Sequence, residues 1–166
     1  MVDVWSHQEL NYVDKANVDD EEQNEYLREA KTLLRPFEGV TRFHKMLSTE
    51  AAELFAANKT TFDFAYIDAR HDYCGVTEDI EAYWPLVRPG GILAGHDYLT
   101  NAVQQAQGGR NKLDDFGLCL DGTRNERAVR GAVEDFAMRN GLTISVMYDE
   151  GNIWRSWMVQ KPGGIL

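Results

Sequence analysis

The sequence has 166 residues, of which 43% are hydrophobic and 27% are charged, and its formal net charge is −10. This composition is typical of one globular domain and argues against a disordered chain. The negative charge argues against nucleic-acid binding and against docking on an anionic membrane, because both tasks need a basic surface. No apolar run approaches the roughly 18 to 20 residues that span a bilayer, and the first ten residues lack the regions of a secretory signal.

The hydrophobic pattern of the first 95 residues alternates between strands and helices. It predicts a strand at 1–5, a helix at 19–37, a strand at 40–47, a helix at 49–58, a strand at 62–67, a helix at 76–84 and a strand at 91–95. Asp19 and Glu22 form a capping-box-like start to the first helix, and Ser48 is the expected N-cap of the second.

The remaining residues are less regular. The stretch 99–125 is rich in Gly, Asn, Gln and Asp, and it is interpreted as a long loop. A helix is expected at 125–140, and two strands with a turn near Gly151 are expected within 143–160. The two cysteines, Cys74 and Cys119, could pair but define no disulfide framework, so we expect a reducing compartment, the cytoplasm.

Strands that alternate with helices predict an α/β fold, a Rossmann-like doubly wound sheet with one antiparallel edge strand. In such sheets ligands bind beyond the carboxyl ends of the strands. Several polar residues fall at those ends, namely Asp3, Ser48, Asp68, His96 and Asp97. The sequence therefore predicts a site at this edge of the sheet.

The stretch FAYIDARHDYCGVTEDIEAYWPLVRPGGILAGHDY, residues 64–98, resembles the class I S-adenosylmethionine-dependent methyltransferases. More narrowly, it is similar to small-molecule O-methyltransferases related to macrocin O-methyltransferase and the cephalosporin hydroxylase-like proteins. The RPGG turn is widespread in that superfamily, whereas D-x-x-H with G-H-D-Y at this separation is more specific. The resemblance implies the methyltransferase fold, S-adenosylmethionine as cofactor and a small-molecule hydroxyl as substrate.

The family's first strand and glycine-rich turn, which cradles the methionine part of the cofactor, would lie before Val2. Gly108-Gly109 lies in the late loop and Gly163-Gly164 follows the last strand, so neither replaces that turn. We therefore expect residues 1–166 to form a single methyltransferase-like domain that is incomplete at its N-terminus. A sheet without its central strand would expose strand edges and apolar surface, which leaves a homo-oligomer open.

The resemblance assigns cofactor contacts to Asp3, Ser48 and Asp68. Asp3 would accept hydrogen bonds from both ribose hydroxyls, the alternative being a solvated carboxylate or a turn cap. Ser48 lies where a serine of catechol-type methyltransferases contacts the adenine, and it could cap a helix as well. Asp68 would meet the cofactor edge or a helix N-terminus if it does not bind a metal.

Asp68 and Asp97 end adjacent strands, so their carboxylates can converge on a divalent cation such as Mg²⁺. The ion would bind the substrate oxygen, lower its pKa and hold it in line with the methyl group. His96 lies at a position that is often acidic in metal-dependent relatives, and a histidine suits a transition metal better than Mg²⁺. The identity of the metal therefore stays open.

His71 lies three residues after Asp68, where catechol-type relatives carry a basic residue that removes the substrate hydroxyl proton. An unperturbed histidine, with a pKa of about 6.5, can do this at neutral pH. The alternative is a structural histidine. Arg70 and Asp72 are expected to be solvated, and Tyr98 is expected to line the pocket or pack.

The leading functional hypothesis is metal-assisted methyl transfer from S-adenosylmethionine to a small-molecule hydroxyl, with His71 as the base. A dehydrogenase has less support, because no G-x-G-x-x-G follows any strand. The remaining alternative is a non-catalytic methyltransferase-fold remnant that binds a partner or a ligand. Binding of S-adenosylhomocysteine would distinguish the first hypothesis from the last.

Overall fold

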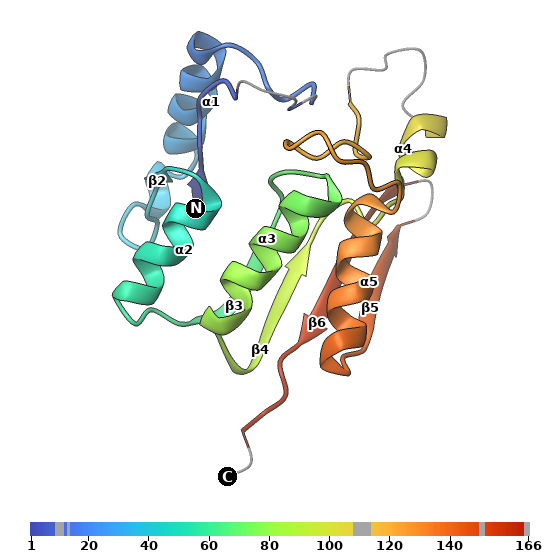
Figure 1. The fold of residues 1–166 in the computed structure, drawn as a ribbon. Coiled ribbons are helices and arrows are strands. Elements are labelled where there is room, and N and C mark those ends of the chain that lie inside the picture. Colours follow the sequence, from blue (N-terminus) through green and yellow to red (C-terminus); the bar gives the residue numbers. More distant parts are fainter. Residues whose placement is uncertain (9–11, 13, 108–113, 150–151, 165–166) are drawn as a thin grey trace.

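The fold is seen in a computed structural model that describes residues 1–8, 12, 14–107, 114–149 and 152–164 (Figure 1). The predicted turn near Gly151 and the Gly108-Gly109 pair lie outside the described residues. No helix among the described residues is both long enough and apolar enough to span a membrane.

Four strands form the larger sheet, in the order β3-β4-β6-β5. Their bounds are Phe62–Ile67 for β3, Val87–Gly95 for β4, Ile144–Asp149 for β5 and Asn152–Gln160 for β6. β3 and β4 are parallel, whereas β6 is antiparallel to both of its neighbours, β4 and β5. This mixed sheet, together with the helices of Figure 1, confirms the predicted α/β class.

Two strands form a separate, smaller sheet. β1 (Val2–Asp3) pairs in parallel with β2 (His44–Lys45), so both strands are shorter than predicted. Among the residues that the structure describes, no ladder joins β1 or β2 to the larger sheet. The edge of β3 that faces away from β4 therefore pairs with no strand of the described chain.

Five α-helices connect and cover these strands in the described chain. They are α1 (Asp20–Leu33), α2 (Ser48–Ala57), α3 (Tyr73–Tyr83), α4 (Asn101–Gln107) and α5 (Ala128–Asn140), with short 3₁₀ turns at Arg35–Phe37 and Trp84–Leu86. The Asp19 carboxylate accepts a hydrogen bond from the Glu22 N–H at 3.0 Å, which confirms the predicted start of α1.

Three predictions about where helices lie or begin were wrong in detail. α3 begins at Tyr73, three residues early, because the Asp72 carboxylate caps it by accepting from the Gly75 N–H at 2.9 Å. α4 occupies part of the predicted loop at 99–125. Ser48 is the first residue of α2 and not its cap, since its hydroxyl donates to Asp79.

The hydrophobic core lies between the larger sheet and two helices, α3 and α5, which cover one of its faces (Figure 1). The core side chains are Ile67, Val76, Ile80, Val87, Leu93, Val129, Ala132, Val133, Phe136, Ala137, Trp157 and Val159. On the other face of β3, Phe64 and Tyr66 are 54% and 45% exposed. This face of β3 thus exposes two aromatic side chains.

Candidate functional site

A cavity of about 770 Å³ lies between β1 and the carboxyl end of β3. Residues 2–6 of the β1 segment form one wall, and residues 68–71, which follow β3, form the other. The remaining sides are formed by α1 and described residues of the segment before it, by the start of α2, by the side of α3 and by residues 119–121. The cavity is therefore at the sheet edge that the sequence predicted, and its two walls belong to different sheets.

His71 is the centre of the polar cluster beside this cavity. Its Nδ1 atom lies 3.0 Å from Oδ2 of Asp14, and its Nε2 atom lies 3.3 Å from Oδ2 of Asp97 and 3.5 Å from Oδ1 of Asp68. The ring also packs against Phe116, with 4.7 Å between centroids. Three separate segments thus bring a carboxylate to one imidazole.

The cluster is assembled because β3 and β4 end side by side. The His96 N–H donates to the Ile67 carbonyl at 3.0 Å, which fixes the residues after β4 next to those after β3. Asp97 is buried and has a φ of 55°, in the left-handed region that Asp and Asn tolerate better than most residues. This backbone conformation places the Asp97 side chain beside His71.

The structure brings together Asp68, His96 and Asp97, the predicted metal ligands. Nδ1 of His96 lies 2.9 Å from Oδ1 of Asp97 and 3.9 Å from Oδ1 of Asp68. Despite that short distance, Oδ1 of Asp97 is buried and has no hydrogen-bond partner among the described residues. A buried carboxylate oxygen without a donor is a suitable ligand for a cation.

The charge on His71 differs from the prediction. Burial lowers the pKa of the imidazole, but hydrogen bonds to Asp14 and Asp68 and the charge of Asp97 outweigh burial and raise the pKa to about 10. His71 is therefore an imidazolium at neutral pH in this arrangement, and the unperturbed pKa assumed from the sequence was wrong. The same hydrogen bond lowers the pKa of Asp14 although burial opposes it.

The two other predicted cofactor residues line the cavity and already have partners. Oδ1 of Asp3 accepts a hydrogen bond from the Trp5 N–H at 2.9 Å, so the carboxylate also caps a turn. The Ser48 hydroxyl donates to Asp79, and the Ser48 carbonyl accepts from the Tyr83 hydroxyl at 3.0 Å. Asp3 keeps a second carboxylate oxygen, and the Ser48 hydroxyl oxygen can still accept a hydrogen bond.

Asp14 and Asp79 are site residues that the sequence did not identify. Asp14 lies in a polar segment far from His71 in the chain, and no pattern marks it. Asp79 is buried on α3, where burial raises its pKa to about 6 although the Ser48 hydrogen bond lowers it. A signal for Asp79 was present, because it lies at helical spacing on the apolar face with Val76 and Ile80.

Arg70 and Asp72, which were expected to be solvated, both have structural partners. Arg70 forms an ion pair with Glu78, and Asp72 is the buried cap of α3. Tyr98 packs against the core, and its hydroxyl donates to Glu134 at 3.3 Å.

Comparison with known families gives a match over more than half of the chain. A family model described as a methyltransferase domain matches residues 1–98. No curated protein matches the sequence.

Solved structures of methyltransferases share the fold. An O-methyltransferase family protein from Burkholderia thailandensis is 20% identical with a TM-score of 0.55, and the match covers 86% of this chain and 42% of that chain. A putative caffeoyl-CoA O-methyltransferase from Staphylococcus aureus is 17% identical with a TM-score of 0.55, covering 84% and 60%. An O-methyltransferase from Bacillus cereus, in complex with S-adenosylhomocysteine, is 17% identical with a TM-score of 0.54, covering 82% and 59%. The present chain thus matches 42% to 60% of the length of these proteins.

Proposed function

Because this chain belongs to the methyltransferase domain family, as its match over residues 1–98 shows, we propose that it transfers a methyl group from S-adenosylmethionine to the hydroxyl of a small molecule. The observation that carries the proposal is the convergence of Asp68, His71 and Asp97 beside a cavity that Asp3 and Ser48 also line. This arrangement places charged groups next to a space of the size that small ligands occupy.

The cavity fits a nucleoside cofactor in its volume and in its polar groups. Asp3 has a second carboxylate oxygen that can accept from ribose hydroxyls, since only Oδ1 is engaged by the Trp5 N–H. Ser48, at the start of α2, lines the same cavity and would contact the base. Asp68 borders the same cavity and would meet the edge of the cofactor that faces the substrate.

The residues present also fit a divalent cation, since Oδ1 of Asp97 is buried and accepts no hydrogen bond from the part of the chain that the structure describes. Asp68 and Asp97 would hold the ion, with His96 as a third ligand if it is a transition metal. When bound, such an ion supplies a positive charge that lowers the pKa of the substrate hydroxyl and offsets the two carboxylates beside His71.

His71 is the proposed base, and Asp14 orients it. The contact between Asp14 and Nδ1 directs Nε2 toward Asp68 and Asp97, the side on which the substrate hydroxyl would approach. Removal of the hydroxyl proton by Nε2 requires that His71 first lose its own proton, because its pKa is about 10 in the present arrangement.

The test is isothermal titration of the full chain with S-adenosylhomocysteine, with and without Mg²⁺. Micromolar binding that Asp3→Asn weakens about tenfold or more, the loss of a charge-assisted hydrogen bond, would support the proposal. Asp63→Asn is the matched control, because Asp63 is an exposed carboxylate on β3 that pairs with Arg88 away from the cavity. Binding that is unchanged in Asp3→Asn would place the cofactor elsewhere.

A non-catalytic role is the second candidate, and the separation of the β1–β2 pair from the larger sheet favours it. In that case the chain would melt cooperatively but bind no S-adenosylhomocysteine at millimolar concentration.

Its cytoplasmic location also stays a proposal, and the disulfide between Cys74 and Cys119 argues against a reducing compartment.

A further inference from the structure

The wall of the cavity contains a disulfide that joins two elements. Cys74, in the first turn of α3, is bonded to Cys119, in the segment that precedes α5, and their Cα atoms are 5.7 Å apart. Asp72, the cap of α3, lies beside them. Asp72 is 5% exposed and Cys119 is 1% exposed, so a carboxylate and a sulfur are buried side by side.

These three side chains have the composition of a metal site. One carboxylate oxygen of Asp72 and the two sulfurs all lie within 4.8 Å of one another. Thiolates select zinc and similar ions over Mg²⁺ or Ca²⁺, and zinc accepts carboxylate oxygen as a further ligand. While the disulfide is intact the sulfurs have no charge to offer, so the oxidised chain cannot use them as thiolate ligands.

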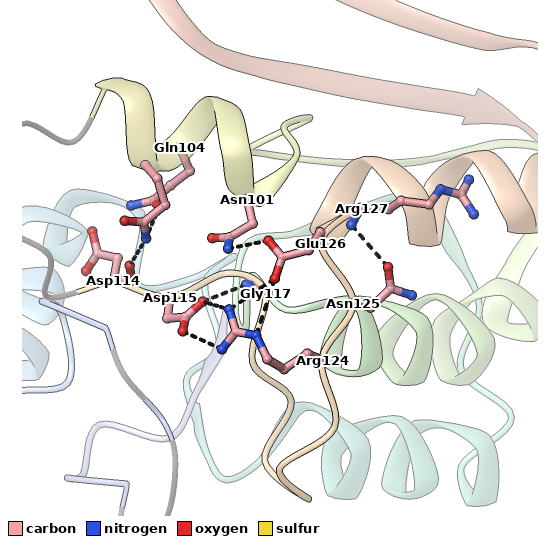
Figure 2. Close-up of polar contacts among 10 residues, drawn as sticks. Asn101, Gln104, Asp114, Asp115, Gly117, Arg124, Asn125, Glu126 and Arg127 are labelled. Carbon is pink, nitrogen blue, oxygen red and sulfur yellow. Dashed lines mark hydrogen bonds and ion pairs between the residues drawn. The ribbon is translucent and has the colours of Figure 1, made fainter.

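The segment that carries Cys119 is held in place independently of the disulfide. Arg124 binds Asp115 through two contacts of 2.9 and 3.1 Å, and the Asn101 amide donates to Glu126 at 2.7 Å (Figure 2). The Cys119 N–H donates to the Thr123 carbonyl at 2.9 Å. Because none of these contacts involves the disulfide, reduction would leave Cys119 close to its present position.

The other two side chains are fixed by α3. Cys74 is the second residue of the helix, and Oδ1 of Asp72 accepts a hydrogen bond from the Gly75 N–H at 2.9 Å. This hydrogen bond leaves the second carboxylate oxygen of Asp72 available. A site whose ligands are held on rigid elements binds a metal with little loss of conformational entropy.

We propose that the reduced chain binds a zinc-class divalent cation through Cys74, Cys119 and Asp72. A phosphine or a dithiol supplies two electrons that break the sulfur–sulfur bond, and the two sulfurs take up two protons. The cation then displaces these two protons, and water from the cavity completes its coordination. The site is separate from the Asp68–Asp97 pair, and it does not rest on methyl transfer.

The test uses Co²⁺ as a spectroscopic substitute for zinc in the full chain. The protein is reduced with a phosphine, which does not compete for the metal as a dithiol does, and is then freed of reductant under argon. We expect one equivalent of Co²⁺ to give the near-ultraviolet charge-transfer absorption of sulfur ligation, and we expect added Zn²⁺ to abolish it. The oxidised wild-type chain is a folded negative control that should show no such absorption.

Variants then identify the ligands. Cys119→Ser should abolish the charge-transfer absorption. Asp72→Asn should weaken Co²⁺ binding about tenfold or more, because loss even of a residue that only hydrogen-bonds to a metal ligand typically lowers metal affinity by about tenfold. Asparagine remains a good helix cap, so Asp72→Asn keeps α3 intact. Asp121→Asn, on the same segment but outside the cluster, should bind like the wild type. Absorption in the oxidised chain or in Cys119→Ser, or none in the reduced chain, would overturn the proposal.

Discussion

The two sheets of this molecule differ in how they are held, although both contribute to the same cavity. The larger sheet is covered by α3 and α5 over a continuous core, and β3 and β4 are joined along most of the length of β3. The smaller sheet pairs only two residues of each strand, and Trp5 is the one large side chain of its first segment that is buried. Asp68, His71 and Asp97 thus stand on the well-packed region, and Asp3 stands on the weakly paired one.

The residues proposed for catalysis, Asp68 and His71, therefore lie in the better packed region, whereas Asp3, a proposed cofactor contact, lies in the less packed one. A ligand that bridges the cavity would add contacts between the two regions and would stabilise the smaller sheet more than the larger one. Occupation of the cavity and order in the β1–β2 pair are therefore expected to be linked.

The largest expected effect comes from breaking the larger region. Phe136 is 2% exposed in the core between α5 and the sheet, so Phe136→Ala should lower the free energy of unfolding by about 3 to 5 kcal/mol. Urea unfolding followed by circular dichroism measures this change. Met138→Ala is the control on the same helix, because Met138 is 75% exposed, and it should cost no more than about 0.5 kcal/mol. Equal costs for both variants would mean that this face of α5 does not form the core.

A smaller effect, of opposite sign, is expected where the two regions touch. Asp79 on α3 accepts the Ser48 hydroxyl of α2, and burial raises its pKa from 3.8 to about 6. The folded state therefore holds this proton more tightly than the unfolded state, and stability rises as the pH falls from about 6 toward 3.8. At neutral pH the charged carboxylate costs stability, and Asp79→Asn should add about 1 to 3 kcal/mol.

Thermal melts of Asp79→Asn and the wild type between pH 4 and pH 8 check this prediction. Glu81→Gln is the matched control, since Glu81 is an exposed carboxylate on the same helix that pairs with Arg139. A variant that is less stable than the wild type at pH 8 would show that the Ser48 contact requires the negative charge.

The smallest effect on global stability is expected from the smaller region. Trp5 packs against Phe43 with 5.9 Å between ring centroids, away from the main core. If the β1–β2 pair opens before the rest unfolds, Trp5→Ala should change the global free energy of unfolding by less than about 1 kcal/mol while speeding hydrogen exchange in residues 1–5 and 42–46. A global cost as large as that of Phe136→Ala would make the two regions one cooperative unit.

Local patterns in the sequence were enough to predict the sheet edge and the polar cluster. The D-x-x-H run after one apolar strand and G-H-D-Y after the next had to meet, because parallel strands in one sheet end on the same side. Asp68, His71, His96 and Asp97 accordingly lie together. Their roles in catalysis and metal binding stay predictions.

Other features could not be predicted because they depend on contacts between distant segments. Asp14 reaches His71 across 57 residues, and the resulting set of carboxylates raises the pKa of a histidine that looks ordinary in the sequence. The start of α3 was placed too late because Asp72 was interpreted as a solvated residue and not as a cap. α4 was not predicted because its sequence is rich in Asn and Gln and lacks an extended apolar stripe.

The left-handed backbone of Asp97 determines which substitutions can be interpreted at this site. The left-handed conformation costs a residue with a Cβ about 1 to 2 kcal/mol, and an aspartate or asparagine side chain offsets part of that cost through local polar contacts that alanine cannot make. Alanine scanning would therefore confuse a distorted chain with a lost ligand. Asparagine tolerates the same conformation, and it removes the charge by replacing one carboxylate oxygen with an amide nitrogen, so Asp97→Asn tests the carboxylate without disturbing the backbone.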